Sequence, residues 1–198
     1  MLKKIALLQK VQEKTGEIFS CLPLSANQIT ACALLFALAG FCLACISQPI
    51  PSLLLFILAG ATDAIDGAVA RAKRQVSPRG AYIDGITDRL VEFLFVLSFF
   101  PYSLPSFVLP SWLSLVSILF FGSTMSAFAT AYAEHRHVAD SKKIARQPGI
   151  LPRAERLVLL FAALASVPFN PAISSAILFA EAVLCAATFA QRFLYFAA

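Results

Sequence analysis

The chain has 198 residues, of which 59% are hydrophobic and only 14% are charged. Soluble domains carry about 25% charged residues, so this composition disfavours a soluble protein and indicates an integral membrane protein. The net charge of +5 does not indicate a nucleic-acid partner, because the aromatic residues lie within apolar runs. A basic excess in an apolar chain instead reflects the preference of Lys and Arg for cytoplasmic loops.

The N-terminal segment, residues 2–20, is amphipathic, with lysine and glutamate side chains interrupting leucine, isoleucine and valine. This pattern differs from that of a cleavable signal peptide. It favours a helix that lies on the anionic membrane surface ahead of the first span. The alternative for these residues is an ordinary polar tail.

Six apolar stretches follow, and none of them alternates with the period of two that is typical of a membrane barrel. We therefore expect an all-α membrane protein with six transmembrane helices. Each span needs ~20 residues, so the chain has little room for anything else, and residues 1–198 should form a single membrane domain. The stretches cover residues 28–47, 51–70, 84–101, 108–134, 156–169 and 171–196.

The connections between these stretches divide by charge. Those after the first, third and fifth spans contain no Lys or Arg, whereas all 16 basic residues lie in the other connections, at their helix ends or in the N-terminal segment. Positively charged loops remain on the cytoplasmic side of the membrane. The pattern therefore predicts that both termini and the basic loops are cytoplasmic.

Four aspartates flank the second connection. Asp63 and Asp66 are three residues apart near the end of the second span, and Asp84 and Asp88 are four apart at the start of the third. Each pair occupies one face of its helix. Because the short loop joins antiparallel neighbours, the four carboxylates are expected to converge at the cytoplasmic end of the bundle.

Converging carboxylates at a membrane are unfavourable, since a charged side chain in the bilayer costs ~2.5–3.5 kcal/mol. Divalent ions account for them, because oxygen ligands suit Mg²⁺ or Mn²⁺, and two such ions could hold a pyrophosphate for attack. Gly67, Ala70 and Gly80 leave space for a nucleotide beside the backbone, and Arg71 can contact a diphosphate through its planar fork.

The sequence DAIDGAVAR, eight further residues and then GAYIDGITD extend from Asp63 to Asp88. This pattern, DxxDGxxAR followed by GxxxDxxxD, resembles the signature of the CDP-alcohol phosphotransferases. The resemblance implies a membrane enzyme that transfers a phosphatidyl-type group from a CDP-linked lipid, diacyl or ether, to an alcohol and releases CMP. It also implies a homodimer.

The same resemblance assigns roles to residues. Asp63, Asp66 and Asp84 would help to ligate a dinuclear metal centre, and Asp88 would be the general base on the acceptor hydroxyl and a further metal contact. The CDP group would lie among a set of motif residues, namely Asp66, Gly67, Ala70, Arg71 and Gly80.

The last basic connection bears on the acceptor alcohol. Its Lys142, Arg146, Arg153 and Arg156 either only set the topology or form a pocket for a phosphorylated acceptor. The segment PGILPRAERLVLL, residues 148–160, is similar to the start of the fifth span in phosphatidylinositol-phosphate synthases and their archaeal ether-lipid relatives. This likeness points to Arg153 and Arg156 as contacts of inositol phosphate.

One departure keeps other acceptors open. The fourth span of those synthases ends with basic residues where this chain has Thr130 and Tyr132. Glycerol 3-phosphate and serine therefore remain alternative acceptors. Glu181 is the only charged residue before Arg192 in the last predicted span, and we expect it to pair with a basic residue across the bundle.

A cation transporter and a membrane scaffold are alternative functions of other classes. A cation transporter would need acidic residues along a path through the membrane, but the aspartates gather at one end of the spans. A scaffold without chemistry would explain the spans and leave the aspartates unexplained. The transferase accounts for both.

Overall fold

The computed structural model describes residues 25–73, 75–140, 143–144 and 149–197, and every regular element in these ranges is a helix. The amphipathic helix expected at residues 2–20 lies outside this part of the chain. The described helices are α2 (Ala26–Cys45), α3 (Pro49–Ala72), α4 (Pro78–Leu97), α5 (Ser111–Ser117), the π-helix η1 (Ile118–Met125), α6 (Ser126–His135), α8 (Arg153–Ser166) and α9 (Pro171–Ala197).

Local sequence signals set where these helices begin. At the start of α2, Ser25 Oγ accepts a hydrogen bond from the Gln28 amide at 3.3 Å, and Gln28 Oε1 accepts one from the Ser25 amide at 2.8 Å. The same reciprocal pattern stabilises many helix N-termini. Ser77 caps α4 by accepting from the Gly80 amide at 3.0 Å, and Pro78 follows as its first residue. The direction of α4 is thereby set just ahead of Asp84.

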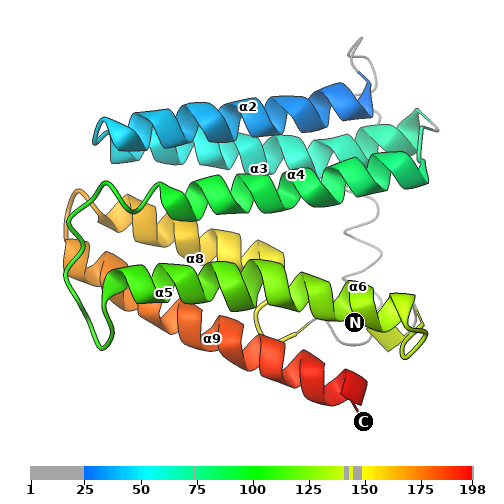
Figure 1. Ribbon diagram of the computed structural model, residues 1–198. Coiled ribbons are helices and arrows are strands. Elements are labelled where there is room, and N and C mark those ends of the chain that lie inside the picture. The colour runs from blue at the N-terminus through cyan, green and yellow to red at the C-terminus, as the bar shows by residue number, and fades with distance from the viewer. Residues whose placement is uncertain (1–24, 74, 141–142, 145–148, 198) are drawn as a thin grey trace, which may run out of the picture.

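The helices form an elongated bundle of two groups (Figure 1). One group contains α2, α3 and α4, and α2 packs extensively on both α3 and α4. The other contains the continuous helix formed by α5, η1 and α6, together with α8 and α9. The α3–α4 turn and the end of α6 lie at the same end of the bundle, and α8 starts part way along its length (Figure 1).

Aromatic side chains join the two groups in the core. Phe56 of α3 stacks on Phe95 of α4 with ring centroids 4.3 Å apart, and Phe95 also contacts Phe161 of α8 at 5.2 Å. Phe56 and Phe95 are each 1% exposed. Such pairs each contribute about 0.5–1.5 kcal/mol beyond their buried area. This cluster ties together the three helices whose polar ends form the site described below.

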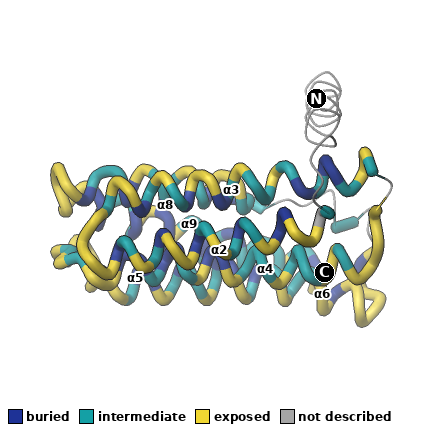
Figure 2. The backbone as a smooth tube through the Cα atoms, turned by 90° about the horizontal axis from the view of Figure 1, so that it is seen from above, coloured by how far each residue is buried: buried dark blue, intermediate teal, exposed yellow. Residues whose placement is uncertain are grey.

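In the part of the chain that the structure describes, four helical segments are long and apolar enough to cross a membrane: Asn27–Cys45, Pro49–Ala72, Ser111–His135 and Pro171–Ala197. They indicate an integral membrane protein. Large apolar side chains such as Leu35, Leu54, Val183 and Leu194 are exposed on them, and exposed positions run along the outside of the bundle (Figure 2).

The predicted spans at 84–101 and 156–169 correspond to α4 and α8, which are not in this set of four. The 14 residues of α8 are fewer than the ~20 that a span normally needs. Helix α4 is long enough, but it carries several charged side chains, namely Arg79, Asp84, Asp88, Arg89 and Glu92. Both helices nevertheless lie alongside the apolar ones within the bundle (Figure 1).

Candidate metal and nucleotide site

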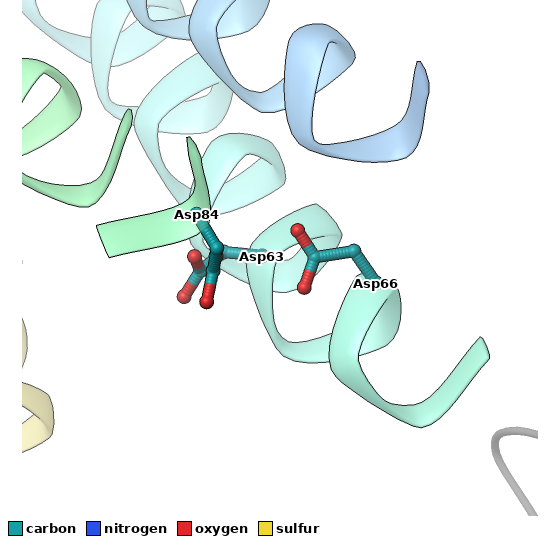
Figure 3. Close-up of side chains that lie close together, drawn as sticks. All are labelled: Asp63, Asp66 and Asp84. Atoms are coloured by element: carbon teal, nitrogen blue, oxygen red, sulfur yellow. The ribbon is translucent and has the colours of Figure 1, made fainter. Parts of the chain in front are cut away.

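Three of the four predicted aspartates meet at the end of the bundle where α3 turns into α4. Asp63 and Asp66 of α3 and Asp84 of α4 each offer a carboxylate oxygen, and these oxygens lie within 4.8 Å of one another. Figure 3 shows the carboxylates of Asp63 and Asp84 side by side, with that of Asp66 directed toward them. Hard oxygen donors at this spacing fit a divalent cation such as Mg²⁺ or Mn²⁺.

Helix α2 orients one member of this triad. The Thr30 hydroxyl donates a hydrogen bond to Asp66 Oδ2 at 2.6 Å, and both residues are buried. The bond fixes the rotamer of Asp66 and leaves its other oxygen for a ligand. Three carboxylates so close together repel one another, and a positive charge among them would offset that repulsion.

The fourth aspartate, Asp88, lies one helical turn beyond Asp84 and is linked to the triad by an arginine from α8. Arg153 Nη1 lies 2.8 Å from Asp88 Oδ2 and 3.0 Å from Asp63 Oδ2. Asp88 Oδ2 is also 3.5 Å from Arg89 Nη1. A single guanidinium nitrogen therefore bridges a metal-type carboxylate and the predicted general base.

A groove of about 230 Å³ opens beside the triad between α2, α3 and the start of α4. All five positions predicted to surround the CDP group line it. The lining residues are Asn27, Thr30, Asp66, Gly67, Ala70, Arg71, Gln75, Val76, Ser77, Gly80, Ala81 and Asp84.

Space for a side chain is tight at one glycine of this groove. A Cβ atom on Gly80 would lie 3.1 Å from Ser77 Oγ, the atom that caps α4. Arg71 bends back along its own helix, with Nη1 3.6 Å from where a Cβ on Gly67 would be. The groove thus places a guanidinium beside the carboxylates, which suits a ligand that carries a diphosphate.

The predicted acceptor residues have different positions. Lys142 and Arg146 lie outside the described residues, and Arg153 is at the aspartate site. Arg156, one turn along α8 from Arg153, is only 5% exposed and pairs with Glu92 inside the bundle. The structure therefore places Arg156 in the interior of the bundle, and its contact with an acceptor stays a prediction.

Sequence reasoning missed several polar residues near the site. Asn27 immediately precedes the first apolar stretch and Thr30 interrupts it, three residues apart, and this helical spacing was an available signal. Glu92 continues the four-residue spacing of Asp84 and Asp88. Arg192 of α9 donates to the Ser126 carbonyl at 2.9 Å and to Thr130 Oγ1 at 3.4 Å. Arg192 thus joins α9 to α6.

Glu181 behaves differently from the expectation. It is fully buried in α9, and neither carboxylate oxygen has a hydrogen-bond partner among the described residues. The expected ion pair is therefore absent from the described structure, because Arg156 bonds to Glu92 instead.

Comparisons with known proteins agree with this geometry. The archaetidylinositol phosphate synthase of Aeropyrum pernix is 31% identical over 150 residues, which cover 76% of this chain and 71% of that protein. The crystal structure of Mycobacterium tuberculosis phosphatidylinositol phosphate synthase with CDP-DAG bound has the same fold, with a TM-score of 0.77, 18% identity and 94% of each chain covered.

A second structure of the mycobacterial enzyme, in complex with manganese and citrate, superposes with a TM-score of 0.73 at 19% identity, covering 93% of this chain and 88% of that one. The pattern of the CDP-alcohol phosphatidyltransferase domain matches residues 23–189. The match takes in the four aspartates, the groove and most of the bundle. The chain thus belongs to the CDP-alcohol phosphatidyltransferase family, whose members are transferases.

Proposed function

We propose that this chain transfers a phosphatidyl-type group from a CDP-linked lipid to a phosphorylated polyol, with inositol phosphate as the first candidate acceptor. The observation that carries the proposal is the position of Arg153, which lies between Asp63 and Asp88. A guanidinium at this place is suited to a phosphate-bearing alcohol that approaches the general base. The synthases named above, which make inositol phosphate lipids, support the same acceptor.

Asp63, Asp66 and Asp84 would hold the divalent ions, which we expect to be two, with Asp88 as a further contact. When bound, such ions would supply positive charge that stabilises the diphosphate as CMP leaves. The manganese in the mycobacterial complex supports this choice of metal. Thr30 would keep Asp66 in its ligating orientation through the 2.6 Å hydrogen bond.

The chain's own residues account for the remaining steps. The groove lined by Gly67, Ala70, Arg71 and Gly80 would bind the CDP moiety. Asp88 would take the proton of the acceptor hydroxyl as the acceptor oxygen forms a bond to the lipid-side phosphorus. The bond from that phosphorus to the bridging oxygen breaks at the same time, and CMP departs with the electron pair.

The same proposal includes the membrane arrangement. We expect α4 and α8 to complete a set of six spans, with both termini and the aspartate site on the cytoplasmic side of the cell membrane. The basic residues at the site end of the bundle support this orientation. We also expect each chain to form a single membrane domain over residues 1–198. Two such chains would work as a homodimer.

A direct assay tests the activity and the acceptor together. The purified chain in lipid nanodiscs is given CDP-diacylglycerol or its ether-lipid counterpart, Mg²⁺ or Mn²⁺, and one acceptor at a time. The acceptors are inositol phosphate, glycerol 3-phosphate and serine. CMP release with inositol phosphate alone supports the proposal, and release only with serine contradicts the phosphorylated acceptor. No release with any acceptor would contradict the transferase.

A further inference from the structure

A closed ionic cluster lies one helical turn deeper in the bundle than the aspartate site. Glu92 follows Asp84 and Asp88 at the same spacing of four, so the three carboxylates share one face of α4. Glu92 is fully buried, and Arg156 of α8 is almost so. Arg156 Nε donates to Glu92 Oε1 at 2.9 Å, and Nη2 donates to Oε2 at 3.0 Å. This is a two-pronged contact that fixes direction as well as distance.

The two arginines of α8 thus form two successive contacts with α4. Arg153 and Arg156 are three residues apart and lie on one face of α8. The first reaches Asp88 and Asp63 at the site, and the second reaches Glu92 in the interior. Because both belong to the first turn of α8, the interior contact constrains where the site arginine lies.

A third helix closes the cluster from the side. Ser123 of η1 donates to Glu92 Oε2 at 3.0 Å. A Cβ on the adjacent Gly122 would lie 2.7 Å from Cys185 Sγ and 3.2 Å from Arg156 Cδ, so the glycine leaves space for the side chains of both residues. The π-helical turn carries both residues, and such turns are frequent at functional sites.

Stability alone does not account for this pair. Replacing a buried ion pair with well-packed apolar side chains is often neutral or stabilising. Arg156 also has Glu181 nearby as a second carboxylate, yet among the described residues its side chain donates hydrogen bonds to Glu92 alone. An apolar pair could fill the same space, but it would not fix the direction of the side chain at position 156. The start of α8 would then be held less firmly.

From this arrangement we infer that Glu92 and Arg156 are a positioning pair for the transfer reaction. They hold the first turn of α8 so that the Arg153 guanidinium stays between Asp63 and Asp88. The inference rests on the proposed function, because it assigns the pair to that same site. Neither residue contacts the substrate.

The main test is the double variant Glu92→Met/Arg156→Met in the full chain, reconstituted in nanodiscs. It keeps a well-filled interior without the directed contact. We expect a thermal midpoint close to that of the wild type and a kcat lower by about tenfold to a hundredfold, as misplaced catalytic groups produce. Wild-type kcat in the folded double variant would overturn the inference.

A second readout is independent of activity. The amides of Glu155 and Arg156 both donate to the Pro152 carbonyl at 3.1 Å, so their hydrogen exchange reports on the first turn of α8. We expect faster exchange there in the double variant and unchanged exchange in α9. Should the wild type release no CMP, the proposed function fails, while this measurement still decides whether the pair holds α8. Unchanged exchange overturns the inference.

Two controls make the test specific. Glu181→Gln changes another buried carboxylate near Arg156. The Glu181 carboxylate has no hydrogen-bond partner among the described residues, so this variant should leave kcat and hydrogen exchange unchanged. The triple variant Arg153→Met/Glu92→Met/Arg156→Met should have the same kcat as the single variant Arg153→Met, because the pair acts through Arg153. Losses that simply add would overturn the inference.

A milder variant covers the case in which the double variant does not fold. Glu92→Asp keeps both charges and shortens the side chain by one methylene, so the two-pronged contact cannot form in its present geometry. We expect a folded protein with faster exchange at the start of α8 and lower kcat. If Glu92→Asp folds and matches the wild type in both measurements, the pair does not position Arg153.

Discussion

Arg153 offers the sharpest test of the proposed acceptor site. The change is Arg153→Ala, with Arg153→Lys as the conservative variant. One guanidinium nitrogen contacts Asp63 at 3.0 Å and Asp88 at 2.8 Å, and the side chain is 25% exposed. A hydrogen bond to a charged group contributes about 1.5–3 kcal/mol, which corresponds to roughly ten- to hundredfold in binding. Partial exposure to solvent favours the lower end of that range.

We therefore expect Arg153→Ala to lower kcat, because Arg153 contacts the proposed general base Asp88, and to raise the KM for the acceptor by about tenfold or more, with little change in the KM for the CDP-lipid. Arg153→Lys keeps the charge and loses the planar fork, so its acceptor KM should lie between those of the wild type and Arg153→Ala. Initial rates of CMP release, measured while each substrate is varied, separate these constants. Arg71→Ala is the matched control, because Arg71 lines the groove and should raise the donor KM instead.

Metal binding distinguishes this role from general damage to the site. Arg153 neutralises Asp63 in the described structure, so its removal leaves the carboxylates more negative. Affinity for Mn²⁺, measured by calorimetry, should therefore stay the same or rise in Arg153→Ala. A loss of Mn²⁺ affinity, or an unchanged acceptor KM, would refute the reasoning.

Two further predictions concern the aspartates and their support. Asp63→Asn, Asp66→Asn and Asp84→Asn should each reduce CMP release by about a hundredfold or more and weaken Mn²⁺ binding, because each removes an oxygen ligand. Each variant should remain folded, because one repelling charge is gone, and its thermal midpoint in metal-free buffer should be at or above that of the wild type. Near-normal activity at limiting metal would contradict the ligand assignment. Thr30→Val keeps the shape but removes the 2.6 Å bond to Asp66, so Mn²⁺ affinity should fall by up to about tenfold. An unaltered affinity would show that Asp66 is oriented by something else.

The sequence predicted local features well because they depend on spacing along one helix. The pairs Asp63 with Asp66 and Asp84 with Asp88 share faces simply through helical periodicity. The third helix was predicted to begin at residue 84, whereas α4 begins at Pro78. Hydropathy detects only the apolar part of a helix, and the cap at Ser77 was the signal for the true start.

Contacts between helices could not be predicted in the same way. Thr30, Glu92 and Arg156 reach their partners from helices that are distant in sequence, and the choice of partner depends on how the bundle packs. Glu181 shows the difficulty directly. Its burial in an apolar span predicted an ion pair, but the nearby Arg156 makes its hydrogen bonds to Glu92. Composition indicates that a buried charge needs compensation, and only the packing shows which charge provides it.

Helices α4 and α8 are not among the four segments that are long and apolar enough to span a membrane. These two helices contact each other through charged side chains. Asp88 and Glu92 on α4 face Arg153 and Arg156 on α8. A charge in the bilayer costs ~2.5–3.5 kcal/mol when it is alone, and pairing offsets much of that cost. If α4 and α8 cross the membrane as we propose, they can do so only as partners. The chemistry of the site and the assembly of the bundle then depend on the same contacts, which explains why Asp88 and Arg153 lie on the helices that are least suited to lipid.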